Sequence, residues 1–434
     1  MNTSKQANNN PATGARPSRA VPFEASLLAA ALCAALGAGV PARADEYHYN
    51  NVLIGDRASG MGGAYTAISD DPTGLYYNPA GIVYAHGNNL SASVNAFHSS
   101  TTTYKKALGG NDWKRESSTL LPNFFGVVQP LGGGMVGFSY AVPDSTLEDQ
   151  DQTFTGLPSS LPGVTITRYV INFNNKDSTY NLGPSYAIKL SDNLSVGGTL
   201  YYHYRERETI NNQLINLDTG QYQWSNTYYQ TDEKGVRPIL GLTWSPADRL
   251  ALGLTLTTVY IRESKTTSQV TLKDITYDGN TVSRTVIQST DKRDFPLSAT
   301  VGAAWFASDK LLVSGDLAYH GKSEDVFVGK KEAVWNWALG AEYYMSANWA
   351  VRAGLFSNLA NTPTVKSGGT NQPEHIDLYG GSASLSYFTG NSATTFGLSY
   401  SQGSGKTQLF GNDTSIQDTD RSALMLFLSA SYTY

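Results

Sequence analysis

Hydrophobic and polar residues alternate along the chain, segment after segment, from about residue 89 onward. In 250–257, four leucines fall on one face and small residues such as Ala251 and Thr255 fall on the other. Similar alternation recurs near 194–205, 333–343 and 424–434. A period of two predicts β-strands, because successive side chains of a strand point to opposite faces.

Two further features favour a transmembrane β-barrel over a soluble β-sandwich. The apolar faces often end in aromatic residues, as expected of rings that lie at the membrane–water interface. The connections also alternate in length, which is typical of outer-membrane barrels. The short turns are Pro130–Gly133, Ser191–Asn193, Ser245–Asp248, Ser308–Lys310, Ser346–Asn348 and Gly390–Ser392, and the long polar stretches are about 100–116, 144–177, 206–234, 264–292, 321–331, 358–374 and 402–420.

The connections divide the chain into fourteen predicted strands. Their approximate starts are Asn89, Ser117, Gly134, Ser178, Leu194, Gly235, Leu250, Arg293, Leu311, Lys331, Trp349, Ile376, Ala393 and Arg421. An even number returns both ends of an antiparallel barrel to the periplasmic side, and closure removes open edges that lipid cannot satisfy. We expect a monomer, with the aromatic C-terminal strand ending at Tyr434 recognised by the barrel assembly machinery.

The N-terminus has the organisation of a secretory signal peptide. A basic stretch with Lys5, Arg16 and Arg19 precedes an apolar run at 25–40, and the sequence Ala42-Arg43-Ala44 provides an A-x-A cleavage signal. The alternative is a buried helix, because the run is too short to span a bilayer. We predict cleavage after residue 44, which would also remove the single cysteine and leave no thiol chemistry.

Composition agrees with export to the outer membrane, facing lipid and lipopolysaccharide. Only 15% of residues are charged, and the mean hydropathy of -0.29 disfavours a helical membrane protein. A barrel is compatible with this value because only alternate residues meet lipid. The net charge of -5 and the lack of a basic tract argue against a nucleic-acid partner.

Residues 45–88 lack strand alternation and are rich in glycine, so they form a separate unit before the barrel at 89–434. Residues 55–82 read GDRASGMGGAYTAISDDPTGLYYNPAGI. Glycines 60, 62 and 63 permit close backbone approach, and Asp70-Asp71-Pro72 suits a turn. Arg57 to Ile68 is compatible with a short helix or turn, and Asn78-Pro79-Ala80 is a rigid stop.

This stretch, with the barrel after it, resembles the FadL/TodX family of outer-membrane transporters for long-chain fatty acids and other hydrophobic molecules. The resemblance implies a fourteen-stranded barrel plugged by an N-terminal hatch, with the family's hatch motif at Asn78, Pro79 and Ala80. It also implies passive diffusion and a lateral opening at a kinked third strand, here about Gly134–Asp144. Gly134, Gly137 and Pro143 are expected to interrupt the hydrogen-bond ladder there.

Candidate ligand contacts come from the predicted lumen. Tyr47 and Tyr49 lie at the start of the mature chain, and Arg205, Arg237 and Arg352 would suit a ligand carboxylate. The alternative is that charges inside the barrel pair with one another or hold the hatch. The whole inferred lumen set is Lys189, His203, Arg205, Arg237, Asp316, His320, Glu342 and Arg352.

Other function classes receive less support from the sequence. No H-E-x-x-H or G-x-S-x-G motif is present and no metal-ligand spacing stands out, so we expect no catalysis, metal or cofactor. A Ser–His pair assembled from separate strands stays open. An adhesin-like structural barrel or a general porin, with polar surface loops, is the main alternative.

Overall fold

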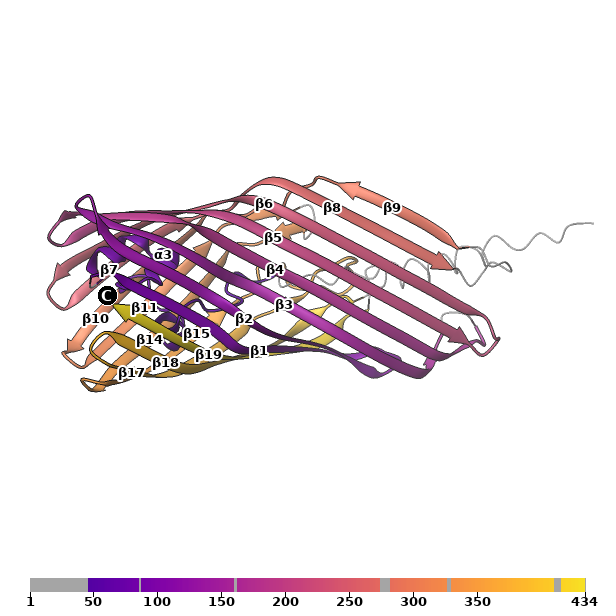
Figure 1. Cartoon of the computed structure of the whole chain (residues 1–434). Helices are drawn as coiled ribbons and strands as arrows, with labels where there is room; N and C mark the ends of the chain where they lie inside the picture. Colours follow the sequence, from indigo (N-terminus) through magenta and orange to yellow (C-terminus); the bar gives the residue numbers. More distant parts are fainter. Residues whose placement is uncertain are drawn as a thin grey trace, which may run out of the picture.

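The structure is a computed structural model that describes residues 46–85, 87–159, 162–273, 282–325, 329–409 and 415–433. It is a closed antiparallel β-barrel of fourteen strands, as the alternation predicts. Strands β1 and β19 pair from Asn89 opposite Thr433 to Tyr104 opposite Thr419 and close the cylinder (Figure 1). Closure avoids a free edge strand, whose backbone groups lipid could not satisfy.

Most barrel strands are single continuous elements. They are β1 (Asn89–Leu108), β2 (Asn111–Leu131), β3 (Gly134–Pro158), β4 (Thr165–Ser191), β5 (Leu194–Leu217), β6 (Tyr222–Ala247), β11 (Leu311–His320), β14 (Val334–Ser346), β15 (Trp349–Asn358), β18 (Ser392–Thr407) and β19 (Gln417–Thr433). Three traverses are interrupted: β7 (Leu250–Thr257) with β8 (Tyr260–Lys273), β9 (Ser283–Ser289) with β10 (Ser298–Ser308), and β16 (His375–Ile376) with β17 (Leu378–Phe388). A hairpin of β12 (Ser323–Asp325) and β13 (Gly329–Lys331) stands apart from the barrel sheet.

The prediction of long loops at 100–116, 144–177 and 206–234 is wrong, because most of these residues are in strands. Pairing continues to Leu108 opposite Asn111, to Pro158 opposite Thr165 and to Asn216 opposite Tyr222. These strands therefore extend one wall of the barrel well beyond the opposite wall (Figure 1). The alternation is weak there because the outer face is mainly polar and the inner face mixes polar residues such as Asn175 with apolar ones such as Ile171 and Phe173.

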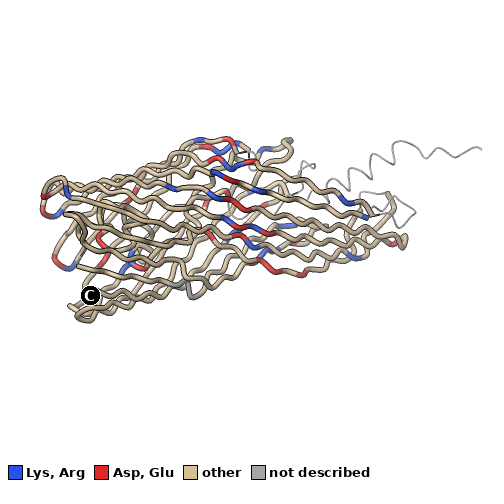
Figure 2. The backbone as a smooth tube through the Cα atoms, turned by 45° about the horizontal axis from the view of Figure 1, so that its top comes forward, with Lys and Arg blue, Asp and Glu red and all other residues tan. Residues whose placement is uncertain are grey.

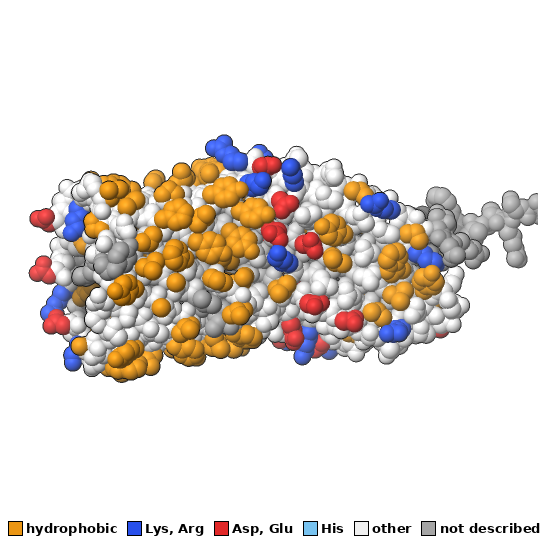
Figure 3. All heavy atoms as spheres, in the orientation of Figure 1, with side chains coloured by type: hydrophobic (Ala, Val, Ile, Leu, Met, Phe, Trp, Pro, Cys, Tyr) orange, Lys and Arg blue, Asp and Glu red, His pale blue; other side chains and the backbone are white. Residues whose placement is uncertain are grey.

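The outer surface has a wide apolar belt at the end of the short turns and a charged belt beyond it (Figures 2 and 3). The predicted facing is confirmed by exposure: Leu254 is 37% exposed and Leu428 48%, whereas Ala251 and Ser429 are buried. The exposed hydrophobic side chains of the belt suit contact with acyl chains, since a soluble monomer rarely shows so large an apolar surface.

Residues 46–85, here called the inner segment, lie inside the barrel (Figure 1). They contain α2 (Asp56–Gly60), α3 (Gly74–Tyr77) and the 3-10 helix η1 (Pro79–Tyr84). Only the first part of the predicted helix at 57–68 is helical, because Gly62 and Gly63 adopt positive φ values of 67° and 88°. Within the described residues, no helix is long and apolar enough to cross a membrane.

Candidate functional site

A buried ion-pair network fixes the inner segment to the barrel wall. Arg57 donates two hydrogen bonds to Glu342 Oε2 on β14, at 2.9 Å from Nε and 2.7 Å from Nη2. Arg352 on β15 donates to the other carboxylate oxygen at 3.1 and 2.9 Å, and to Ser386. Arg57 also pairs with Asp70 of the inner segment itself. Glu342 is therefore a shared anchor for two arginines.

Asp316 on β11 provides a second anchor through backbone groups. Its Oδ2 accepts hydrogen bonds from the N–H groups of Tyr65 at 3.0 Å and Thr66 at 2.9 Å. Nearby, the Tyr65 hydroxyl donates to Asp71 at 2.7 Å, and Thr73 N donates to the other oxygen of that carboxylate at 2.7 Å. Burial raises the pKa of Asp71 to about 6. The turn predicted at Asp70-Asp71-Pro72 is thus held by hydrogen bonds from Tyr65, before it, and Thr73, after it.

Asn78 of the predicted hatch motif joins three parts of the molecule. Its Nδ2 donates to Thr66 O at 2.7 Å within the inner segment and to Leu242 O and Thr243 Oγ1 on β6, each at 3.1 Å. Its Oδ1 accepts from Ala80 N at 3.1 Å and caps η1. Asn78 is fully buried, so these bonds replace all of its contact with water.

Inward-facing glycines let the inner segment approach the wall closely. A side chain at Gly197 on β5 would collide with Pro79 C at 2.6 Å and Ala80 N at 2.7 Å, and one at Gly241 on β6 would collide with Asn78 Oδ1. The glycines that would bring a side chain against the inner segment in this way are Gly137, Gly197, Gly241, Gly253, Gly302, Gly340 and Gly354. The wall and the inner segment are therefore complementary in shape.

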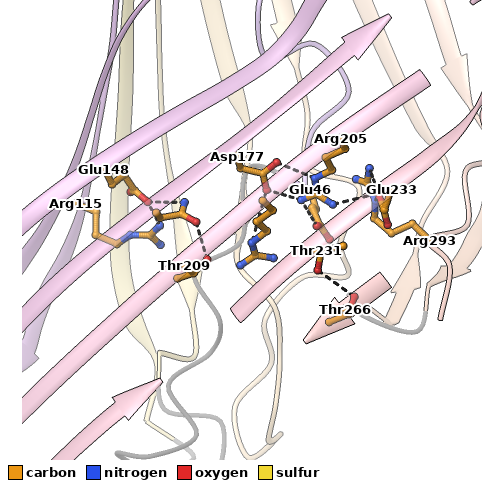
Figure 4. Close-up of polar contacts among 12 residues, drawn as sticks. Glu46, Arg115, Glu148, Asp177, Arg205, Thr209, Thr231, Glu233, Thr266 and Arg293 are labelled. Carbon is orange, nitrogen blue, oxygen red and sulfur yellow. Dashed lines mark hydrogen bonds and ion pairs between the residues drawn. The ribbon is translucent and has the colours of Figure 1, made fainter. Parts of the chain in front are cut away.

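A second polar network lies around Glu46, the first described residue (Figure 4). Arg205 on β5 pairs with Glu46 at 2.7 Å and with Asp177 on β4 at 2.6 Å, and Glu233 on β6 lies 3.7 Å away. Arg293 contacts Glu233 at 2.7 Å. Burial opposes ionisation of Glu46, yet Arg205, Arg293 and Arg207 outweigh it and hold the pKa of this carboxyl well below its usual range.

The network continues around the wall toward β2. Arg115 pairs with Glu148 on β3 at 2.6 Å, Asn175 on β4 donates to the same carboxylate at 2.9 Å, and Thr209 on β5 donates to Asn175 at 2.8 Å. Figure 4 shows these side chains in a row across neighbouring strands. Buried charges are tolerated only when paired and hydrogen-bonded, and this row meets that condition.

A cavity of about 260 Å³ lies between the inner segment and the strands of the wall. The apolar side chains that line it are those of Val52, Leu53, Ile239, Phe295, Pro296 and Phe356. Polar groups meet it on one side. Arg237 contacts the Tyr76 hydroxyl at 3.1 Å, and in the described part of the chain it makes no ion pair with a carboxylate. Asn181 Oδ1 lies 3.0 Å from His203 Nδ1, and Asn181 Nδ2 and His203 Nε2 have no hydrogen-bond partner.

The structure separates the predicted ligand contacts into two groups. Tyr49 and Arg237 line the cavity, and the Tyr49 ring stacks on His320 with centroids 4.0 Å apart. Tyr47, Arg205 and Arg352 do not line it: Tyr47 O accepts from Asn361 N, and both arginines are held in ion pairs. Phe295 and Pro296 were missed because they were assigned to a strand starting at Arg293, whereas β10 begins at Ser298.

The wall is interrupted beside this cavity. Strands β2 and β3 pair from Leu131 opposite Gly134 to Phe124 opposite Ala141, and again only at Ser117 opposite Glu148. A register shift in β3 against β4 falls between Ala141 and Asp144, and Pro143 and Asp144 line the cavity. The expectation that Gly134 and Gly137 interrupt the ladder is wrong, because both are paired. Pro143 does lie in the unpaired stretch.

Comparisons with known proteins identify the fold. No family model matches the sequence, and no curated protein matches it. Among solved structures, a FadL homologue of Pseudomonas aeruginosa is 15% identical with a TM-score of 0.64, and the alignment covers 89% of this chain and 99% of that one. The toluene transporter TodX of P. putida is 14% identical, with a TM-score of 0.63 and coverages of 89% and 99%.

The toluene transporter TbuX of Ralstonia pickettii gives a similar result. It is 15% identical, with a TM-score of 0.60, and the alignment covers 88% of this chain and 99% of that chain. Each match extends over nearly the whole of the known structure, although the sequences have diverged widely. The chain therefore has the fold of the FadL and TodX transporter barrels.

Proposed function

We propose that this protein is a passive outer-membrane channel that admits hydrophobic small molecules, such as long-chain fatty acids or aromatic hydrocarbons. The observation that carries the proposal is the cavity, which lies between a barrel-filling inner segment and a break in the wall. A molecule in this cavity would lie between the inner segment and the wall, beside an unpaired stretch of β2 and β3 that borders the membrane. The solved structures of the same fold are named as hydrocarbon transporters and FadL homologues, which supports this assignment.

The inner segment acts in this proposal as a hatch. It is tied to the wall by Glu342, Asp316 and Asn78, so the lumen is not an open aqueous pore. A cleaved signal peptide at 1–44 precedes it; those residues lie outside the described part of the chain. The hatch is residues 45–88 and the barrel is residues 89–434. In this orientation the short turns face the periplasm, and so do the paired strand ends Asn89 and Thr433. Glu46, at the start of the hatch, lies inside the lumen and not at the periplasmic end.

The cavity favours a ligand with an apolar body and one hydrogen-bond acceptor. Ile239, Phe295 and Phe356 supply apolar lining. Arg237 and Asn181 Nδ2 supply donors, and leaving the buried Asn181 Nδ2 without a partner costs about 1–3 kcal/mol. A carboxylate or another acceptor group would satisfy them. Arg237 is then the residue most directly placed for ligand contact.

The unpaired stretch at Pro143 supplies the proposed exit. Proline has no N–H to donate to a ladder, and β3 also shifts its register against β4 at the same place, between Ala141 and Asp144. A ligand leaving there would pass sideways into the membrane. It would thereby avoid the ion-pair anchors at Glu342 and Asp316, so the hatch does not have to unfold.

A general porin is the alternative that the inner segment disfavours, and an adhesin would not require an enclosed cavity. The deciding experiment compares two readouts of the purified protein and of cells that express it. We expect near-silent planar bilayers together with faster uptake of labelled oleate or toluene than in cells lacking the protein. Large steady ionic currents without such uptake would overturn the proposal. The proposed transport involves no catalytic step.

A further inference from the structure

The outward surface of the extended wall differs from the lipid-facing belt. Strands β4, β5, β6 and β8 continue beyond the charged belt, with Ile171 and Phe173 buried on the inner face. The alternate residues therefore face outward. We name ten of them the amide–aromatic face: Asn172, Asn174, Asn212, Asn216, Tyr222, Trp224, Asn226, Tyr228, Gln230 and Gln269. A small group of hydrophobic side chains beyond the charged belt is visible in Figure 3.

Strand register brings these side chains together. Asn172, Asn212 and Asn226 are direct partners across three strands. In the next row Asn174 and Ile210 are partners, Ile210 also pairs with Tyr228, and Tyr228 pairs with Gln269. Tyr222 and Trp224 lie two residues apart on β6, so their side chains are about 7 Å apart on the same face. The result is a surface in which amides lie beside the aliphatic residues Ile210 and Leu214, with aromatic rings along one strand.

Hydrogen bonds hold several of these groups in place. Trp224 Nε1 donates to Asn212 Oδ1 at 2.7 Å, Asn174 Nδ2 donates to Asn172 Oδ1 at 3.3 Å, and the Tyr228 hydroxyl donates to Gln230 Oε1 at 3.1 Å. Each bond uses only part of the capacity of the amide, which has two donors and an acceptor with two lone pairs. The remaining capacity suits a neutral ligand that is rich in hydroxyl groups, and the aromatic faces suit its C–H groups.

The position of the face along the strands indicates where such a ligand comes from. On β5 the outward residues change from Leu200 and Tyr202 to Tyr204, then to Glu206 and Glu208, and then, after Ile210, to Asn212. Tyr204 stacks on Tyr180 with centroids 6.1 Å apart, and Glu206 pairs with Lys176 at 2.7 Å. Apolar, aromatic and charged positions therefore precede the amide row along this strand. Acyl chains, interface, charged headgroups and sugars follow in the same order across the outer leaflet.

We propose that the amide–aromatic face binds the uncharged sugars of outer-leaflet lipopolysaccharide. The inference rests on the outer-membrane location in the proposed function, but not on the transported ligand. None of the ten residues is charged, although charged groups border them: Glu208 lies opposite Gln230, Lys273 Nζ lies 3.9 Å from the centre of the Tyr222 ring, and Arg284 donates to Gln269 Oε1 at 2.8 Å. Polar contacts by amides and stacking by the three aromatic side chains distinguish this surface from the acyl-facing belt of the same barrel.

Calorimetric titration with lipid-free core oligosaccharide and O-polysaccharide, released from lipopolysaccharide by mild acid, tests the proposal. The protein is used whole, in detergent. We expect saturable binding that weakens at least tenfold in the triple variant Tyr222→Ala, Trp224→Ala and Tyr228→Ala. Asn212→Asp, which keeps the size of the side chain, should weaken binding as well. A matched triple variant, Tyr379→Ala, Tyr387→Ala and Tyr400→Ala, removes exposed aromatics from the opposite wall and should bind like the wild type.

Three outcomes would overturn the proposal: no binding of either saccharide by the wild type, wild-type affinity in both face variants, or binding of lipid A alone. Heat-modifiable migration in gels shows that each variant is folded. Uptake of a hydrophobic probe, measured on the same variants, should stay unchanged. Loss of uptake by the wild type with intact sugar binding would contradict the proposed function and leave this inference standing.

Discussion

Arg57 of the inner segment and Glu342 of β14 form a buried ion pair, with Nη2 and Oε2 2.7 Å apart. The carboxylate is fully buried and also accepts hydrogen bonds from Arg352 on the neighbouring strand. The pair joins residues 285 positions apart in sequence and ties the content of the barrel to its wall. This contact, together with those of Asp316 and Asn78, holds the inner segment in place.

Glu342→Gln should therefore destabilise the protein by about 3–5 kcal/mol, because the buried Arg352 loses its counter-charge and Arg57 keeps only Asp70. Denaturant-induced unfolding in detergent measures this change. Glu206→Gln, which breaks the exposed pair with Lys176, is the control and should cost no more than about 1 kcal/mol. Equal effects of the two substitutions would contradict the anchoring role of Glu342.

Asn78→Ala should loosen the hatch and raise the ionic conductance of the channel. The substitution leaves Leu242 O and Thr243 Oγ1 without the bonds that tie η1 to β6, at about 1–3 kcal/mol for each buried group. Replacing Asn78-Pro79-Ala80 by Gly-Ser-Gly should act more strongly. Asn391→Ala, in an exposed turn, is the control in the same bilayer recordings. Unchanged conductance in both motif variants would argue against the hatch role.

Two neighbouring glycines provide a matched steric test. Gly197→Val points a branched side chain at Pro79 and Ala80, where its Cβ would meet Pro79 C at 2.6 Å. Gly198→Val points outward, and its Cβ has only ordinary contact with Leu240 at 3.6 Å. We expect Gly197→Val to raise conductance and lower the thermal transition, and Gly198→Val to leave both near wild type. Similar behaviour of the two variants would mean that the inner segment does not lie against β5.

The sequence predicts the barrel because lipid imposes a simple rule on alternate residues. Leu250, Leu254 and Leu428 could be assigned to the outer face from period alone, and Gly134, Leu194 and Trp349 were correct strand starts. The extended wall was missed because Asn174 outside and Asn175 inside give no contrast in hydrophobicity. Its strands are stabilised by backbone pairing and by buried ion pairs that join distant positions.

The candidate site was only partly predictable for a related reason. The alternation of side chains along each strand predicted that Arg205, Arg237 and Arg352 all face the lumen. It did not indicate which of them would form ion pairs with carboxylates. Arg205 meets Asp177 and Glu46, and Arg352 meets Glu342, so Arg237 alone of the three faces the cavity. Register across strands decides such pairing, and a single sequence contains little information about it.

Leu254→Arg should destabilise the protein by about 2–4 kcal/mol, as expected for a cation that faces the middle of the bilayer. Leu254 is exposed on the belt between its strand partners Leu242 and Val301. Thr153→Arg, on the exposed outer side of β3 in the extension, is the control and should be neutral. Folding titrations in lipid vesicles measure both. A neutral result for Leu254→Arg would place the membrane elsewhere on the barrel.

Closing the gap between β2 and β3 should block transport without changing the fold. The register on either side of the gap places Leu121 opposite Asp144. Cysteines at these two positions, joined by a short bis-maleimide, should abolish the uptake of a hydrophobic probe. The same link between Val127 and Phe138, which are already paired, should have little effect. Normal uptake after complete cross-linking at the gap would rule out this exit.

The most direct test of the central claim is the initial rate at which a labelled hydrophobic probe enters cells with and without the protein, with a small polar sugar measured in parallel. A plugged barrel with this internal cavity predicts faster uptake of the hydrophobic probe, reduced by Arg237→Met for a carboxylate-bearing probe, and no change for the sugar. Faster uptake of the sugar, with no gain for any hydrophobic probe, would contradict the account.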